Sequence, residues 1–181
     1  MACFQYKEEA ERFYERLKHR MKHFGLSLEE EKSRLIEFGR FAQRDAKRRG
    51  EKAETFDFLG FTHYCSESRN GKFRVKRKTS KKKMRKKCKE MNRVIKSLRT
   101  KKVEEIIKRL NQTLIGYYHY YGITDNGRSI NNFYYYVEAR LRYWLNRRSQ
   151  KKSYTWEGYQ ELLKYYPLIR PRIYVSIYEN C

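Results

Sequence analysis

The sequence predicts an α+β fold: a mixed part with a helix, short strands and a hairpin (residues 1–78), then a mainly α-helical bundle (residues 79–166) and a short tail (residues 167–181). Two β-like runs joined by Asn70-Gly71 predict the hairpin. Beyond residue 79, apolar residues recur every three or four positions, which is typical of helices with one buried face. Between Arg69 and Lys102 the chain carries eighteen Lys or Arg residues against one acid, Glu90.

The N-terminal part begins with a short apolar stretch, residues 1–6, which is predicted to be a strand. Residues 7–24 are predicted to form a helix ended by Gly25, with acids at its start and bases at its end, as the helix dipole favours. Residues 26–28 and 33–38 are predicted to be short strands, with a helical turn capped by Ser27 as the alternative. Residues 40–55 show no clear period and are predicted to be a loop. The buried helix face is expected to comprise Ala10, Phe13, Tyr14, Leu17, Met21 and Phe24.

The hairpin strands are predicted over residues 56–65 and 72–78. Thr79 or Ser80 is placed to cap a basic helix that runs to about Leu98 and has one narrow apolar stripe. Further helices are predicted over residues 102–121, 129–149 and 156–166, the last of them stopped by Pro167. Gly116 lies inside the first of these three, where glycine costs about 1 kcal/mol relative to alanine. It permits close approach of a neighbouring helix or of an RNA backbone.

The composition indicates a folded, strongly basic chain. Its formal net charge is +23, yet aromatic residues make up 16% of it, which disordered chains rarely reach. Cations interleaved with aromatics suit RNA or single-stranded nucleic acid. No apolar run reaches membrane-span length and the N-terminus lacks a signal-peptide pattern, so we expect a cytoplasmic protein without a membrane partner. Four scattered cysteines form no CxxC pair and are expected to be free thiols: Cys3, Cys65, Cys88 and Cys181.

The chain shows no recognisable catalytic pattern. Its three aspartates are scattered, so they do not predict a two-metal site. His19 and His23 have the spacing of a metal pair on a helix, but no third ligand lies nearby. His63 and Cys65 share one side of a predicted strand without a group to orient them. There is no phosphate-binding or dinucleotide-binding glycine pattern. We therefore expect a binding protein with no catalytic residue, metal site or cofactor in this chain.

Several segments resemble group II intron reverse transcriptases/maturases. Phe-Gly-Leu at residues 24–26 and Glu-Glu-Lys-Ser-Arg-Leu-Ile-Glu-Phe-Gly at residues 30–39 resemble the late palm, and Phe-Asp-Phe-Leu-Gly-Phe at residues 56–61 resembles the primer-grip hairpin. Ser-Lys-Lys at residues 80–82, Leu-Asn at 110–111 and Leu-Ile-Gly-Tyr-Tyr-His-Tyr-Tyr at 114–121 resemble the maturase-specific region, called thumb and domain X. The resemblance implies a palm remnant in residues 1–78 and a thumb/X bundle in residues 79–166.

The resemblance also implies what this chain does. The family's Tyr-Ala-Asp-Asp motif falls upstream of the matched segments, so Mg²⁺ is expected only in a complete polymerase, and Lys32 takes the place of a lysine that assists nucleotide addition there. The expected function is that of an RNA-binding maturase portion supporting folding and splicing of group II intron RNA, with an RNA/DNA duplex as a further partner. The alternatives are the C-terminal half of a split RNA-directed DNA polymerase that needs a separate N-terminal fragment, and a gene remnant without function.

The predicted nucleic-acid contacts are the cations of the basic helix and of the third helix, together with exposed tyrosines. Tyr118 is set apart from these because it lies on an apolar stripe and is expected in the core. Tyr136, Lys151 and Lys152 extend the predicted surface. The four primer-grip-like residues are Phe58, Leu59, Gly60 and Phe61. The predicted contact residues are Lys76, Lys78, Lys81, Lys82, Lys83, Arg85, Lys86, Lys87, Lys89, Arg93, Arg140, Arg142, Arg147, Arg148, Tyr120 and Tyr135.

Overall fold

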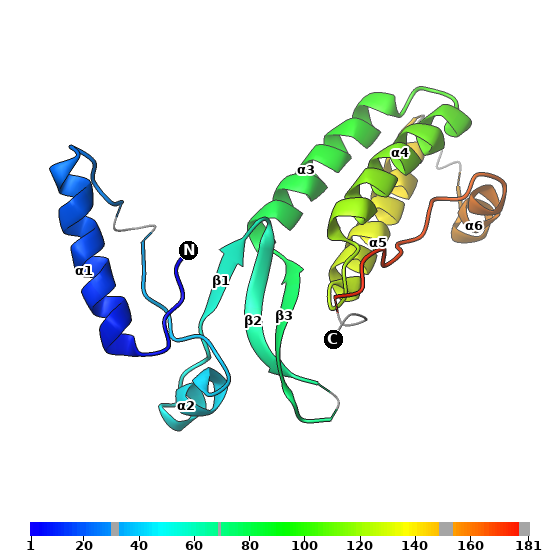
Figure 1. Ribbon diagram of the computed structural model, residues 1–181. Helices are drawn as coiled ribbons and strands as arrows, with labels where there is room; N and C mark the ends of the chain where they lie inside the picture. The colour runs from blue at the N-terminus through cyan, green and yellow to red at the C-terminus, as the bar shows by residue number, and fades with distance from the viewer. Residues whose placement is uncertain (30–32, 69, 149–153, 178–181) are drawn as a thin grey trace. The chain divides into compact units, whose positions relative to one another are not determined.

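The computed structural model describes residues 1–29, 33–68, 70–148 and 154–177 (Figure 1). It confirms the predicted α+β order of a helix and hairpin followed by a helical bundle. The chain divides into two compact units, Met1–Thr55 and Phe56–Cys181, so the hairpin and the bundle belong to the same unit. The elements are α1 (Lys7–His23), α2 (Ala42–Arg48), β1 (Thr55–Phe58), β2 (Phe61–Glu67), β3 (Phe73–Thr79), α3 (Lys81–Leu98), α4 (Val103–Tyr121), α5 (Gly127–Leu145) and α6 (Trp156–Tyr165).

The first unit differs from the sequence-based prediction. Helix α1 forms as expected, but within this helix, which the structure describes throughout, no residue is buried. The strands predicted over residues 1–6, 26–28 and 33–38 do not form. A strand needs a neighbouring strand for its backbone hydrogen bonds, and the described residues of this unit supply none. The turn considered at Ser27 runs into residues 30–32, outside the described residues.

The loop predicted over residues 40–55 is also wrong, because it contains α2. Ala42 and Ala46 are buried one helical turn apart, at 5% and 3% exposure. Two alanines in a polar segment are too short a periodic signal to distinguish a helix from a loop. Helix α2 was therefore missed because the burial of its two alanines is not apparent from the local sequence.

The hairpin of the second unit forms across Asn70-Gly71, as predicted. Strands β2 and β3 pair antiparallel from Phe61↔Thr79 to Glu67↔Phe73, and β1 borders β2. The single strand predicted over residues 56–65 is instead split into β1 and β2. Leu59 and Gly60 both adopt positive φ, 47° and 82°, and reverse the chain in two residues. Leucine rarely takes this conformation, so the apolar run itself did not indicate the turn, whereas Gly60 and the resemblance of residues 56–61 to a hairpin agree with it.

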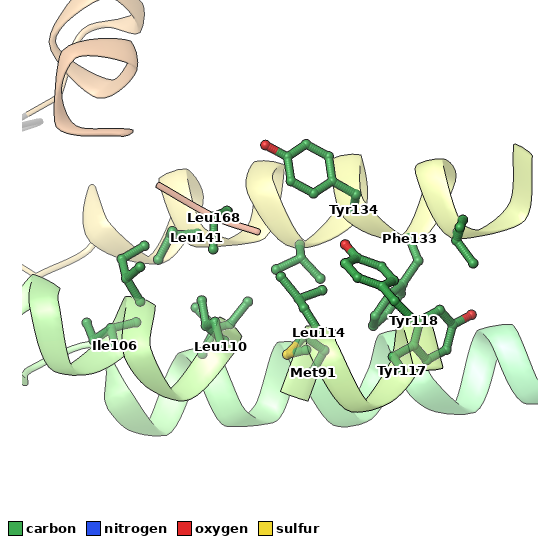
Figure 2. Packing of buried hydrophobic residues seen from close by; sticks show 14 of the residues in the cluster. Met91, Ile106, Leu110, Leu114, Tyr117, Tyr118, Phe133, Tyr134, Leu141 and Leu168 are labelled. Atoms are coloured by element: carbon green, nitrogen blue, oxygen red, sulfur yellow. The ribbon is translucent and has the colours of Figure 1, made fainter. Parts of the chain in front are cut away.

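Helices α3, α4 and α5 lie side by side and enclose the core of the second unit (Figure 1). Figure 2 shows the apolar side chains of these helices meeting between them. Tyr118, expected in the core, is fully buried. Tyr159 fixes α6 to this core, since its hydroxyl donates a hydrogen bond to Glu138 O at 2.8 Å. The buried core residues include Met91, Ile95, Leu110, Leu114, Phe133, Val137 and Leu141.

The segment after α6 follows the bundle. Asn111 on α4 holds it with both ends of its amide: Nδ2 donates to Pro167 O and Oδ1 accepts from Ile169 N, each at 2.9 Å. Leu168 between them is 4% exposed and joins the core. Further on, Val175 forms an isolated parallel bridge with Ile123. The tail thus adds to the burial of the bundle.

Candidate nucleic-acid interface

The basic helix α3 begins at Ser80, whose hydroxyl oxygen accepts a long hydrogen bond of 3.4 Å from Lys83 N–H. The first turn holds lysines and no acid, and cations at this end oppose the helix dipole. The compensating stabilisation comes from the opposite side, where Met91 and Ile95 are each 1% exposed. Burying a side chain of that size contributes about 1.5–3 kcal/mol. Packing therefore holds α3 in place and leaves its outer surface to cations.

The outer surface of α3 carries cations in a helical repeat. Its four outermost residues are spaced by four, three and four positions, which aligns them on one face of the helix, opposite Met91. Lys81, Lys83 and Arg85 flank this face and are exposed as well. We call the four the outer face of α3; they are all exposed: Lys82, Lys86, Lys89 and Arg93.

Two further lysines lie on β3. Residues two apart in a strand point to one side, so Lys76 and Lys78 share a face of the hairpin with Tyr64, which is paired with Lys76 in the register. The opposite face carries the buried Phe61 and Cys65. Lys78 is exposed, and its Nζ lies 5.0 Å from the centroid of the Tyr64 ring. The structure therefore places both predicted lysines on the hairpin face that points away from Phe61 and Cys65.

The arginines of α5 (Arg140 and Arg142) and of the turn after it (Arg147 and Arg148) divide into two kinds. Arg140 and Arg147 alternate with tyrosines: Arg140 Cζ lies 5.4 Å from the Tyr136 ring and 5.6 Å from the Tyr143 ring, and Arg147 Cζ lies 4.4 Å from Tyr143. A guanidinium stacked on a ring keeps its planar donors available for phosphate or base edges. This row of alternating charge and ring fits contact with nucleic acid.

Arg142 and Arg148 instead contact the bundle. Arg142 lies over Trp156, 4.8 Å from the ring, and its buried Nε has no hydrogen-bond partner among the described residues. Arg148 Nη2 donates to Lys101 O at 2.8 Å and so ties the end of α5 to the start of α4. The sequence could not separate these two arginines from Arg140, because the direction of a side chain depends on which helix packs beside it.

The primer-grip-like residues dock on the end of α4. Tyr120 hydroxyl donates to Leu59 O at 2.8 Å, and its ring stacks on Phe61 with centroids 5.9 Å apart. Tyr120 therefore has a structural contact beside its exposed surface. Phe58 and Leu59 remain exposed at 45% and 67%. Tyr135 on α5 is 56% exposed and is accessible for stacking.

One buried amide joins the hairpin to the bundle, and sequence reasoning missed it. Asn126 is fully buried; its Oδ1 accepts from Thr79 N at 2.7 Å, and its Nδ2 donates to Thr79 Oγ1 at 2.9 Å and to Tyr121 O at 2.8 Å. In the sequence, Asp125-Asn126-Gly127 signals only a turn. The contact partner lies 47 residues earlier, so no local pattern could have indicated this role.

A groove of about 350 Å³ lies between α3 and α4. Its α3 side carries Lys83, Lys86 and the ion pair of Lys87 with Glu90, 2.9 Å apart. Sequence reasoning found these cations but not the α4 side, because only packing shows which residues face them. The full lining is Lys83, Lys86, Lys87, Glu90, Gln112, Thr113, Gly116, Tyr117 and Tyr121.

The floor of the groove carries no charge. Burial raises the pKa of Tyr117 and also that of Tyr121, so both phenols stay protonated at neutral pH. Gly116 contributes bare backbone, and nothing among the described residues lies within 4 Å of where its Cβ would be. The close approach of a neighbouring helix that Gly116 permits is therefore not seen within this part of the chain. The groove combines a cationic wall with a neutral aromatic floor.

The structure also locates the remaining candidate residues. Among the described residues, no group of three or more His, Cys, Asp or Glu side chains is arranged to hold a metal ion. Burial lowers the pKa of His63, whose ring stacks on Phe56 with centroids 4.8 Å apart. In the same part of the chain, no helix is long and apolar enough to cross a bilayer. Lys32, Lys151 and Lys152 lie outside the described residues.

Residues 81–164 match the family described as "Group II intron, maturase-specific domain". The matched segment begins at the first residue of α3 and ends inside α6, so it includes the outer face of α3, the groove and the stacked row on α5. No curated protein and no solved structure gives a significant match to the chain.

Proposed function

We propose that this chain binds structured RNA, group II intron RNA above all, and stabilises the folded, splicing-competent form, because residues 81–164 match the group II intron maturase-specific domain. The phosphates of the RNA lie along the outer face of α3. Arg140 on α5 and Arg147 in the turn after it add donors next to α3, since α5 and α3 pack against each other.

The outer face of α3 is the observation that supports this function best. An ordinary soluble helix mixes charges of both signs on its exposed side. Helix α3 instead exposes cations along its whole length and buries a narrow seam. Repulsion among these cations is relieved when a polyanion lies against them, and RNA phosphates are spaced closely enough to do so.

Charge reversal on the outer face tests the proposal. Lys82→Glu, Lys89→Glu and Arg93→Glu together remove three cations without touching the buried seam. Neutralising a phosphate changes the slope of log K against log salt by about 0.9 for a duplex, so the slope should fall by about 2–3 in the variant. Fluorescence anisotropy with a folded group II intron fragment, measured between 50 and 200 mM salt (about a four-fold range), gives the slope.

A matched control carries the same change in net charge elsewhere in the second unit. Lys101, Lys108 and Lys164 are exposed and lie outside the outer face of α3; their triple change to Glu should leave most of the slope intact. Circular dichroism should show the same helix content in both variants. If the slope fell equally in both variants, RNA binding would depend on net charge alone, and the assigned surface would be wrong.

A second candidate function is that of one half of a split RNA-directed DNA polymerase. The apolar side of α1 supports it: Phe13 is 42% exposed, and no residue of this fully described helix is buried. A separately supplied N-terminal fragment would cover that side. Primer extension by a mixture of this chain with a fingers–palm fragment tests the idea. Extension that depends on both polypeptides supports it, and a folded mixture without activity speaks against it.

A further inference from the structure

The groove between α3 and α4 differs in chemistry from the outer face of α3. Lys83, Lys86 and Lys87 give it three ammonium groups against one carboxylate, that of Glu90. Because Glu90 already pairs with Lys87 at 2.9 Å, Lys83 and Lys86 supply the excess positive charge. An anionic group entering the groove would meet these two lysines first.

The opposite wall suits a polar, planar ligand. Thr113 Oγ1 donates to Arg109 O at 3.2 Å, so its lone pairs can accept a hydrogen bond from a ligand in the groove. The Gln112 amide carries both donors and an acceptor, as base edges do. At the floor, the rings of Tyr117 and Tyr121 have centroids 4.6 Å apart. Tyr117 is only 5% exposed, so the accessible ring surface is that of the half-buried Tyr121. Accessible aromatic surface attracts a nucleobase whatever its identity.

The size of the groove limits the ligand. Its volume of about 350 Å³ is at the small end of ligand pockets. One nucleotide fits this volume, whereas a stacked base pair does not. A base held in a duplex is also unable to enter, because it remains stacked between its neighbours. The open backbone at Gly116 leaves room above the floor.

We propose that the groove between α3 and α4 binds a single unpaired nucleotide of the bound RNA, with its phosphate at Lys83 and Lys86 and its base against the ring of Tyr121. This inference rests on the proposed RNA-binding function. It adds a preference for bulged or looped nucleotides, which cations on a helix surface alone do not provide.

Gly116→Trp tests the proposal by filling the groove without changing its charge. The control is Ile115→Trp, at an exposed position next to it that does not line the groove. The probes are two RNA hairpins that differ only by one bulged nucleotide. The natural chain should bind the bulged hairpin about five-fold more tightly or better, the low end for one base on an aromatic surface. Gly116→Trp should remove this preference, and Ile115→Trp should keep it.

Filling the groove must not be confused with unfolding. Glycine inside a helix is unfavourable, so Gly116→Trp should not lower the helix content or the melting temperature. A second variant acts by charge instead. Glu90→Gln removes the carboxylate of the groove and should strengthen binding of the bulged hairpin more than Glu105→Gln does, which removes the same charge from an exposed site on α4.

The outcomes separate this inference from the function on which it rests. Equal affinity of the natural chain for both hairpins overturns the nucleotide site and leaves RNA binding intact. No binding of either hairpin at low salt overturns both. Adenosine monophosphate serves as the free-nucleotide probe: if millimolar concentrations displaced the bulged hairpin, the groove would be a site for a free nucleotide and the proposed RNA ligand would be wrong.

Discussion

Removing the Asn126 amide should destabilise the second unit more than any surface change. In Asn126→Ala, Thr79 N–H loses its side-chain acceptor, Thr79 Oγ1 loses the amide but keeps its contact with Tyr117, and Tyr121 O loses one of its donors. A buried polar group left without a partner costs about 1–3 kcal/mol. Thr79 N–H is the group most fully deprived, because Tyr121 O still accepts from Ile123 N at 2.9 Å. We therefore expect a loss of about 2–4 kcal/mol in the free energy of unfolding.

Urea denaturation followed by circular dichroism measures this loss on the full chain. The matched control is Asn131→Ala, which removes an exposed side-chain hydrogen bond to Gly127 O and should cost less than about 1 kcal/mol. A double-mutant cycle with Thr79→Ala isolates the contact of Asn126 with the Thr79 hydroxyl, with an expected coupling of about 1 kcal/mol. A loss below about 0.5 kcal/mol in Asn126→Ala would show that the joint does not contribute to folding.

Three further predictions concern backbone space and pH. Gly60→Ala should destabilise by about 1–2 kcal/mol in urea denaturation, because φ is +82° and the new Cβ would lie 2.9 Å from the Tyr121 hydroxyl. Adding Tyr121→Phe should reduce that cost, and an unchanged cost would show that the backbone conformation alone is responsible. Gly122→Ala should cost about 3 kcal/mol, since its Cβ would clash with the carbonyl oxygens of Tyr118 and Arg172, whereas Gly116→Ala, in open space, should stabilise by about 1 kcal/mol. Thermal melts that rank the two variants the other way would refute this. Burial holds the pKa of His63 below the ordinary histidine value of about 6.5, so the unfolded chain takes up the proton first and stability falls as pH drops below about 6.5. His63→Phe should make the loss of stability between pH 7 and 5 smaller, as denaturation at both pH values would show.

The helices of the second unit could be predicted because each buries one stripe. Met91, Ile95, Leu110 and Leu114 follow a periodic spacing, because a helix that buries one stripe needs apolar residues at every third or fourth position. The strands and the short helix of the N-terminal unit have no such periodic pattern. Its predicted strands need partners that its described residues do not supply, and α2 buries only two small side chains. Helix α1 was predicted correctly although it buries no residue, so the local pattern failed only for the strands and for the short α2.

The sequence indicated which cations belong to the candidate interface, but not which way each side chain points. The cations of α3 are apparent from the sequence, because the narrow apolar stripe forces the other residues outward. The arginines of α5 and of the turn after it all looked equivalent, yet Arg142 and Arg148 contact the bundle. The α4 wall of the groove and the Asn126 joint depend on residues far apart in sequence. Such contacts leave no periodic trace, so only the fold reveals them.

The unfavourable first turn of α3 makes ionic strength act in opposite directions on the free and the bound protein. Without RNA, the lysines behind Ser80 repel one another and the positive end of the helix, and dissolved ions shield them. Added salt should therefore raise the melting temperature of the free chain while it weakens the complex. In the proposed complex, phosphates would replace the dissolved ions as the shield, so RNA binding should stabilise the first turn of α3.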